Sequence, residues 1–369
     1  MNSDWYTINN IDQIDSPALA VYTERAKENI KILKGFVDDV TRLRPHVKTH
    51  KSSEISKMLM DASIKKFKCA TIAEAEMLAI AGAPDVLLAY QPVGPKATRL
   101  AALIKKYPST KFSCLIDNLS VAKHISELTE KSNLAINVFI DVNVGMNRTG
   151  IIPEQSLKLF EECQLLKGIT IVGLHAYDGH LRDPDLEVRK KQCDEGYSKV
   201  EILHKQIKDK FSKDLLIIAG GTPSFSIHAK RKGIECSPGT YIYWDKNYGQ
   251  TLTEQPFLHA ALVITRVISK PDDETITVDL GHKSIASENP LPNRVTFLNA
   301  PDLQPFGHSE EHLVLKAGKG NTFKVGDVLY GLPYHICPTV ALHDRVQVIE
   351  DGKAVGTWST LARNRIITI

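Results

Sequence analysis

Residues 44–51, RPHVKTHK, combine side chains that could carry out carbonyl chemistry. Lys48 lies at the end of a short strand-like run, among histidines and other cations. Desolvation and nearby positive charge both lower the pKa of a lysine and leave part of it neutral and nucleophilic. Such an amine can form a Schiff base. A solvated basic turn or a phosphate-binding patch is the plainer interpretation of the same residues.

Two glycine-bearing segments farther along the chain could bind a phosphate group. Residues 220–224, GGTPS, follow a strongly apolar run, and residues 237–241, SPGTY, belong to the next expected strand. Glycine lets the backbone approach an anion, and successive N–H groups can cradle it. Tight turns use the same residues, so a lone Gly-Gly-Thr is a weak signal. Together with a Schiff-base lysine, a phosphate cup suggests pyridoxal phosphate (PLP) as the cofactor.

The pair His335 and Cys337, in GLPYHICPT, offers two ligands for a metal ion. Alternate residues of an extended segment point to one face, so an imidazole and a thiolate could bind one ion such as Zn²⁺. Two protein ligands would leave room for water or substrate, as in a catalytic site. Chance spacing is the alternative explanation. Further candidate ligands, or else members of solvated loops, are His308, Glu310, Glu311, His312, His343 and Asp344.

Alternating β-type and helical patterns in the first two-thirds of the chain predict an α/β fold, a (β/α)8 TIM-type barrel. The expected strands are residues 42–48, 67–71, 85–90, 112–117, 136–143, 170–177, 215–220 and 235–241. Helical patterns between them include residues 52–62, 72–81, 96–106, 121–131 and 153–166. Continuous apolar runs such as residues 215–219 are typical of parallel strands buried on both faces. A doubly wound open sheet is the alternative.

The expected strand ends carry the residues that a barrel enzyme would use. In such barrels the catalytic residues lie at the C-terminal ends of the strands. Those ends are polar, reactive or glycine-rich here: Lys48, Thr71, Gln91, Asp117, residues 143–148, His175, residues 177–180, 220–222 and 239–241. We therefore expect them to form the rim of one site.

The last third of the chain has a different pattern. Short β-runs separated by turn residues replace the helical stretches, at residues 260–268, 275–279, 312–316, 327–332, 345–350 and 365–369. They predict a C-terminal antiparallel β-domain. The expected division is a barrel at residues 16–250 and a β-domain at residues 251–369, with residues 1–15 adding a strand.

Composition excludes some partners and compartments. The 369 residues include 46 basic and 43 acidic side chains, a net charge of +3, which does not suggest a nucleic acid or an anionic membrane as partner. No run is long and apolar enough to span a bilayer, and the N-terminus lacks the pattern of a secretory signal. Six cysteines without a CxxC pair are typical of a reduced, cytoplasmic protein.

In order and spacing, several segments make the chain resemble the D-threonine aldolase and D-serine dehydratase family of PLP enzymes. That family has the alanine-racemase-like barrel of fold type III, and the resemblance extends over essentially the whole chain. The segments are residues 44–51, 141–150 (DVNVGMNRTG), 175–180 (HAYDGH), 219–224 (AGGTPS), 237–241 (SPGTY), 309–312 (SEEH) and 335–339 (HICPT).

The resemblance implies roles for individual residues. Lys48 matches the lysine that carries PLP, whereas Lys51 is its rival on chemical grounds alone. Arg148 matches an arginine aimed at the phenolic oxygen of the cofactor, and Tyr177 matches a tyrosine near its ring. His180, near the metal, could serve as a base. The phosphate cup and its surroundings would comprise Gly220, Gly221, Thr222, Gly239, Thr240 and Tyr241.

The resemblance also makes His335 and Cys337 the metal ligands, in the His-x-Cys form associated with the dehydratases. Zn²⁺ suits this pair, and Mn²⁺ remains open if the other ligands are oxygens. Ser237 stands where the racemases carry an arginine against the pyridine nitrogen. Without a strong donor there, the ring is a weaker electron sink, which argues against racemisation.

The implied activity is that of a PLP- and metal-dependent lyase acting on D-β-hydroxy-α-amino acids. The D-threonine aldolase reaction would give glycine and an aldehyde. The alternative is a D-serine or D-threonine dehydratase, an ammonia-lyase that gives an oxo acid and ammonia. A non-catalytic PLP carrier is a remote alternative, because such carriers lack a C-terminal β-domain. The resemblance also implies a homodimer.

Overall fold

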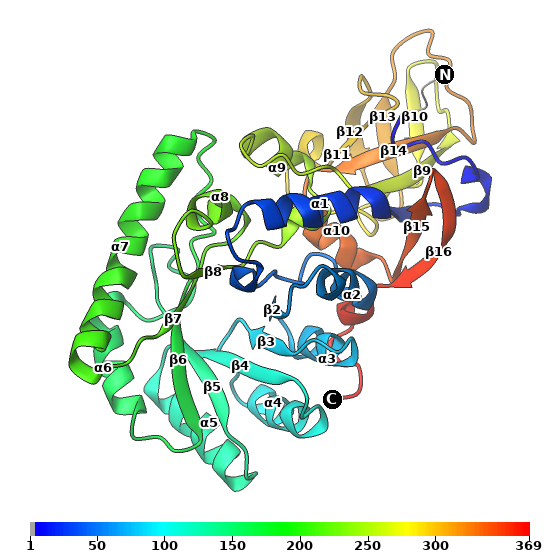
Figure 1. Cartoon of the computed structure of the whole chain (residues 1–369). Helices are drawn as coiled ribbons and strands as arrows, with labels where there is room; N and C mark the ends of the chain where they lie inside the picture. Colours follow the sequence, from blue (N-terminus) through cyan, green and yellow to red (C-terminus); the bar gives the residue numbers. More distant parts are fainter. Residues whose placement is uncertain (1–3) are drawn as a thin grey trace. The chain divides into compact units, whose positions relative to one another are not determined.

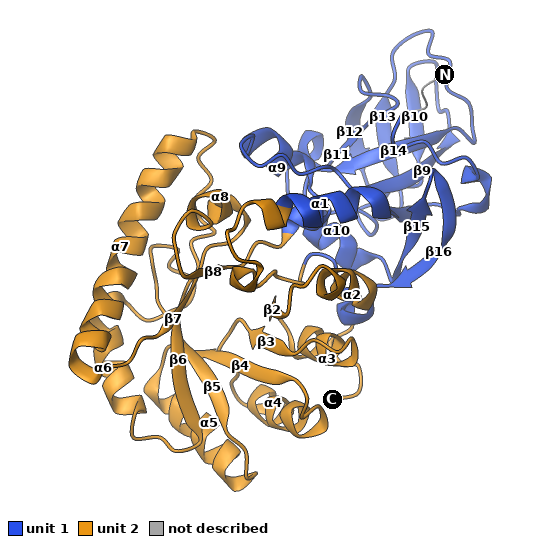
Figure 2. Ribbon diagram, viewed as in Figure 1, with its two compact units in different colours: residues 1–32, 49–52, 240–363 blue, residues 33–48, 53–239, 364–369 orange. Residues whose placement is uncertain are grey.

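The computed structural model describes residues 4–369, and the chain forms two units (Figure 2). The unit with the parallel sheet, here called the barrel unit, comprises Leu33–Lys48, Ser53–Gly239 and Asn364–Ile369. The other, here called the β unit, comprises Met1–Ile32, Thr49–Ser52 and Thr240–Arg363. Each unit has a sheet and a hydrophobic core of its own.

A seven-stranded parallel sheet with its strands in sequence order is the centre of the barrel unit. Buried apolar side chains from four of its strands, Leu87, Leu115, Phe139 and Ile218, pack together as one cluster. The strands are β2 (Lys66–Cys69), β3 (Asp85–Leu88), β4 (Lys111–Ile116), β5 (Ile136–Asp141), β6 (Ile169–Ala176), β7 (Leu216–Ala219) and β8 (Ile234–Cys236).

Residues 43–47 join the two edges of this sheet. Leu43 forms a parallel bridge with Cys236 of β8, and His46 forms one with Lys68 of β2. The sheet is therefore closed by an eighth, irregular strand, which confirms the predicted (β/α)8 barrel. The strand predicted at residues 42–48 is less regular than expected, because Pro45 has no N–H to donate to a ladder.

Helices surround the sheet of the barrel unit, and α3 to α7 lie on its outer face in Figure 1. Thr71 caps α3: its hydroxyl accepts from the Glu74 N–H at 3.0 Å, while the Glu74 carboxylate accepts from the Ala70 N–H. The helices are α2 (Ser53–Asp61), α3 (Ile72–Ile80), α4 (Pro95–Lys106), α5 (Leu119–Lys131), α6 (Pro153–Cys163), α7 (Leu186–Phe211) and α8 (Phe225–His228). None of the helices in residues 4–369 is both long and apolar enough to cross a membrane.

The β unit contains a nine-stranded, mostly antiparallel sheet. One pair, β1 with β15, is parallel. The strands are β1 (Ala18–Tyr22), β9 (Ala261–Ser269), β10 (Thr275–Val278), β11 (Val295–Phe297), β12 (Gln304–His308), β13 (Leu313–Lys316), β14 (Val328–Pro333), β15 (Arg345–Glu350) and β16 (Lys353–Ser359). Helix α1 (Thr23–Gly35) follows β1, and α9 (Lys246–Thr251) and α10 (Ile336–Leu342) lie later in the chain.

The two ends of the chain differ from the expected elements. The added strand is β1, at Ala18–Tyr22, and residues 4–15 form no strand; residues 1–3 of the expected segment lie outside the described residues. The β-run predicted at residues 365–369 is wrong. This segment is irregular and belongs to the barrel unit, because the buried Glu76 carboxylate accepts the N–H groups of Thr368 and Ile369 at 3.0 and 3.3 Å.

Arg44 anchors the closing segment from inside the barrel unit. Its side chain is almost fully buried, and its Nε donates to Glu235 Oε2 of β8 at 2.8 Å. Its Nη1 pairs with Asp85 at the start of β3. Lys66 of β2 also pairs with Glu235. One guanidinium thus ties the closing segment to strands on both sides of it.

Replacing Arg44 by methionine should destabilise the protein by about 3 kcal/mol, because it leaves a buried carboxylate with fewer partners. Urea unfolding followed by circular dichroism measures the change. The control is Lys208→Met, which breaks an exposed pair with Asp214 and should cost less than about 1 kcal/mol. Equal, small effects of both substitutions would contradict the anchoring role.

Candidate active site

Lys48 lies directly after the closing segment, in a turn at residues 47–50. It is half-buried, and its backbone N–H donates to His46 Nδ1 at 3.2 Å. Lys51, the rival lysine, belongs to the β unit, where its backbone has a left-handed φ of 51° and its carbonyl accepts from the Ala362 N–H at 3.3 Å. The structure thus assigns the two candidate lysines to different units.

Tyr177 follows β6, and two predicted site residues, Arg148 and Gly221, lie close to its ring. The guanidinium carbon of Arg148 lies 4.9 Å from the ring centroid. A Cβ at Gly221 would lie 2.6 Å from Cε2 of the same ring, so the turn approaches Tyr177 closely enough to require glycine. His180 is exposed, and a Cβ at Gly145 would lie 3.2 Å from its Nε2. The predicted base therefore lies beside the segment of residues 141–150.

The two glycine segments of the predicted phosphate cup meet in the barrel unit. Thr222 Oγ1 accepts the Gly239 N–H at 3.1 Å. Gly220 has a left-handed φ of 77°, which turns the chain after β7. Ser237 is 3% exposed, and its hydroxyl has no hydrogen-bond partner among residues 4–369. A buried hydroxyl without a partner is costly, so a ligand atom at this point fits the residues present.

The remaining predicted site residues belong to the β unit. The Cys337 Sγ lies 3.1 Å from Thr49 Oγ1 and 3.6 Å from Thr240 Oγ1. Tyr241 is 1% exposed, and its hydroxyl has no hydrogen-bond partner. Burial raises the pKa of that hydroxyl, so it stays protonated and can donate to a ligand.

His335 and Cys337 lie together, but not on the extended segment that the sequence suggested. His335 is the N-cap of α10, and Cys337 lies in the first turn of that helix. Their side chains hydrogen-bond with each other, and His335 Nδ1 lies 2.5 Å from Glu288 Oε1. A carboxylate on the far nitrogen is the usual support of a metal-binding histidine.

The charges around His335 suit a cation. Burial alone would lower its pKa, but Cys337, Glu288 and Asp245 outweigh burial and raise the pKa to about 9. The imidazole is therefore surrounded by groups that stabilise positive charge. A divalent ion held by the imidazole and the thiolate would replace that proton, because metal ligands must be deprotonated. The donor set fits a zinc-type ion.

Apart from His312, the other candidate ligands from the sequence have partners of their own. His308 bonds Arg294 Nη1 at 2.8 Å and the Leu280 carbonyl at 3.0 Å. His343 Nε2 bonds the Ser284 carbonyl at 2.8 Å. The remaining pairs are Glu310 and Glu311 with Lys283, and Asp344 with Arg345.

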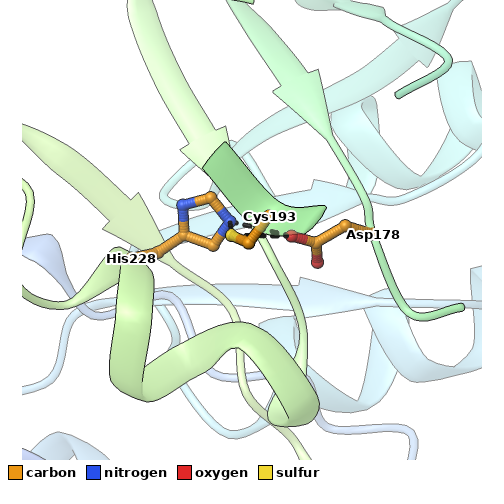
Figure 3. A group of neighbouring side chains, drawn as sticks. All are labelled: Asp178, Cys193 and His228. Carbon is orange, nitrogen blue, oxygen red and sulfur yellow. Dashed lines mark hydrogen bonds and ion pairs between the residues drawn. The ribbon is translucent and has the colours of Figure 1, made fainter. Parts of the chain in front are cut away.

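A cluster that the sequence did not reveal lies in the barrel unit. Asp178, Cys193 and His228 bring a carboxylate, a thiol and an imidazole within 4.8 Å of one another (Figure 3). In residues 4–369 it is the one group of three such side chains close enough to share an ion. Asp178 lies in the HAYDGH motif, but no motif marks the other two residues.

A second unexpected feature of the barrel unit is a buried row of three polar side chains. Lys68, on β2, is 1% exposed, and its Nζ lies 3.4 Å from His175 Nε2. His175 Nδ1 lies 2.7 Å from Asp141 Oδ1. A charged side chain in the middle of a barrel strand was the one available signal in the sequence.

The Asp141 carboxylate determines which nitrogen atom of His175 carries a proton in this row. His175 Nδ1 must carry the hydrogen that Asp141 accepts, so Nε2 of a neutral ring accepts from Lys68. Burial keeps the pKa of His175 low, which favours the neutral ring. Burial, together with the charge of Lys48, also lowers the pKa of Lys68 to about 7. Lys68 is thus a buried amine that can gain or lose a proton near neutral pH.

Lys68 should make the stability of the protein depend on pH. Between about pH 7 and 10.5 the unfolded chain binds a proton that the folded chain does not, so wild-type stability rises across that window. Lys68→Met removes this pH-dependent contribution to the free energy of unfolding. The variant should gain stability over wild type most at about pH 6.5, and the gain should shrink by up to about 3 kcal/mol by pH 9.5.

Urea unfolding of both proteins at the two pH values measures this difference, with Lys208→Met as the control at an exposed site. A gap between wild type and Lys68→Met that stays constant with pH would show that Lys68 has an ordinary pKa in the fold.

Known proteins resemble this chain over nearly its whole length. It is 28% identical to a D-threonine aldolase of Arthrobacter sp, covering 95% of this chain and 93% of that one. It is 22% identical to a D-threo-3-hydroxyaspartate dehydratase of Delftia sp. (strain HT23), covering 94% and 97%. The crystal structure of the D-threonine aldolase from Filomicrobium marinum has a TM-score of 0.88 at 25% identity and covers 99% of both chains.

Family models match both parts of the chain. Residues 21–246 match the alanine racemase N-terminal domain, and residues 260–349 match a putative serine dehydratase domain. The first match alone covers more than half of the chain. The chain therefore belongs to the alanine racemase N-terminal domain family, in the form that continues into a putative serine dehydratase domain.

Proposed function

We propose that this protein is a PLP- and metal-dependent lyase of D-β-hydroxy-α-amino acids, and that its reaction is of the D-threonine aldolase type. One observation carries the proposal: Lys48 follows the segment that closes a barrel of this family. The full-length similarity to the Arthrobacter and Filomicrobium D-threonine aldolases supports the substrate class.

Residues of the barrel unit would hold the cofactor. Lys48 would bind PLP covalently, and the turn of Gly220, Gly221 and Thr222 would bind its phosphate. Arg148 would face the phenolic oxygen, and the unpartnered Ser237 hydroxyl would face the ring nitrogen. When bound, PLP would stabilise the electron pair left on the substrate carbon after a bond to it breaks.

His335 and Cys337 would hold the divalent cation, and Glu288 would orient the imidazole of His335. The cation would supply Lewis-acid chemistry to the β-hydroxyl of the substrate. Zn²⁺ suits imidazole and thiolate, and Mn²⁺ is the alternative if oxygen ligands complete the shell.

Which proton is removed would decide the products. In the aldolase reaction a base accepts the proton of the β-hydroxyl group, and we assign this role to His180, which is exposed. In the dehydratase reaction the freed Lys48 amine accepts the proton from Cα. Similarity to the Delftia dehydratase and the His-x-Cys pair favour this second candidate function.

A PLP carrier is disfavoured, because the family match continues through residues 260–349. The homodimer and the cytoplasmic location remain predictions.

Product analysis tests the proposal directly. Purified protein with added PLP and Zn²⁺ should convert D-threonine to glycine and acetaldehyde, and L-threonine should give neither. Prior treatment with a chelator should lower the rate at least about tenfold, because the cation polarises the hydroxyl. Oxo acid and ammonia as the main products would instead establish the dehydratase. No product from D-threonine, D-serine or a 3-hydroxy-D-aspartate would contradict the lyase proposal.

Lys48→Ala should abolish covalent cofactor binding. The purified wild type should show the visible absorption band of lysine-bound PLP, and the variant should lack it and lose at least about a thousandfold in activity. The matched control is Lys51→Ala, which should keep the band. Loss of the band in Lys51→Ala alone would move the cofactor to that lysine.

A further inference from the structure

The buried cluster of Asp178, Cys193 and His228 joins three parts of the barrel unit. Asp178 follows β6, Cys193 lies in α7, and His228 ends the short helix α8. Figure 3 shows the three side chains pointing toward one another. Their exposed fractions are 5%, 1% and 2%, so bulk water does not reach their polar atoms.

Asp178 accepts hydrogen bonds from several donors. Ser224 Oγ donates to its Oδ1 at 2.5 Å, and His228 Nε2 donates to its Oδ2 at 2.8 Å. The Cys193 thiol lies farther from Oδ2, at 3.6 Å. Although burial alone would raise the pKa of Asp178, His228 and Ser224 hold it below its ordinary value. The carboxylate is therefore ionised and provided with donors by the protein alone.

These distances favour a hydrogen-bonded cluster over a metal centre. Two ligands about 2.0 Å from a tetrahedral zinc ion lie about 3.3 Å apart. The 2.8 Å between His228 Nε2 and Asp178 Oδ2 is shorter and typical of a charge-assisted hydrogen bond. In addition, burial raises the pKa of the Cys193 thiol, which disfavours the thiolate that a metal would need.

The same side chains lie directly against the glycine turn. A Cβ at Gly220 would lie 2.7 Å from both His228 Cδ2 and Ser224 Oγ. Ser224 Oγ also accepts the Gly221 N–H at 3.4 Å. Asp178 thus hydrogen-bonds to Ser224 and His228, the two side chains that pack against the backbone of the turn. The Gly220 N–H also donates to the Ala176 carbonyl at 2.9 Å, so these contacts fix the shape of the turn. A turn fixed in this way would not need to reorder its backbone when an anion binds.

We propose that Asp178 is a positioning residue of the phosphate cup, and that with Ser224 and His228 it fixes the turn of residues 220–222 in its anion-binding form. This inference rests on the proposed function, since it takes the anion to be the phosphate of PLP. It predicts that the cluster affects binding of the phosphate group and leaves the rest of the cofactor unaffected.

Comparison of PLP with pyridoxal, which lacks the phosphate, separates these contributions. The dissociation constants of both ligands are measured by fluorescence titration of apoprotein for wild type, Asp178→Asn, Ser224→Ala and the control Ser198→Ala, an exposed serine on α7. Asp178→Asn should weaken PLP binding at least about tenfold and Ser224→Ala about threefold or more. Pyridoxal binding should change less than about twofold in each.

Each outcome decides a different point. Absence of PLP binding by wild type would contradict the proposed function itself. Equal weakening of PLP and pyridoxal in the variants, or no weakening of PLP, would overturn the positioning role. If circular dichroism shows that Asp178→Asn is unfolded, the PLP and pyridoxal dissociation constants of Ser224→Ala alone test the positioning role. Metal analysis completes the test: bound metal should be lost in Cys337→Ala and kept in Cys193→Ala. Loss in Cys193→Ala would make the cluster a metal centre.

Discussion

Closure of the barrel by residues 43–47 is the constraint on which the candidate site depends. The backbone N–H groups of Arg44 and His46 donate to carbonyls of Cys236 and Pro238, each at 2.9 Å, on one side. On the other side the Val47 N–H donates to the Lys68 carbonyl at 2.9 Å. Lys48 follows this segment directly, so the hydrogen bonds that complete the sheet also fix the backbone of the candidate lysine.

The barrel interior combines this closure with buried charge. Arg44 neutralises Glu235 near one edge of the sheet, while Lys68 shares its surroundings with His175 and Asp141. Buried ionisable groups are retained where each has a partner, because an unpaired charge would cost several kcal/mol. These two groups of side chains join strands that are distant in sequence.

Much of the architecture could be predicted from local pattern. Continuous apolar runs such as those of β3 and β7 indicate buried parallel strands, and polar or glycine residues at their ends indicate the rim. The site motifs could be proposed because they resemble those of the PLP family in order and spacing. The structure brings Arg148 close to Tyr177 and Thr222 close to Gly239, while the roles of these residues stay predictions.

Features that depend on long-range packing could not be predicted. Residues 335–339 were expected to be extended, but α10 begins at Ile336, and proline is tolerated in the first turn of a helix, where Pro338 lies. The apolar pattern of residues 365–369 suggested a strand, but Glu76 provides the hydrogen-bond partners that a ladder would have provided. The surroundings of Lys68 and of Asp178 arise from neighbours 15 or more residues away, which no local pattern encodes.

Which lysine carries the cofactor is the central claim, and the barrel unit offers two candidates: the half-buried Lys48 and the buried Lys68, whose pKa is about 7. Borohydride reduction of the holoprotein makes the bond between PLP and lysine permanent, and peptide mass spectrometry then locates it. If Lys48 carries the cofactor, the pyridoxyl group will be found on Lys48. Its presence on Lys68 or Lys51, or its absence from every lysine, would contradict this assignment.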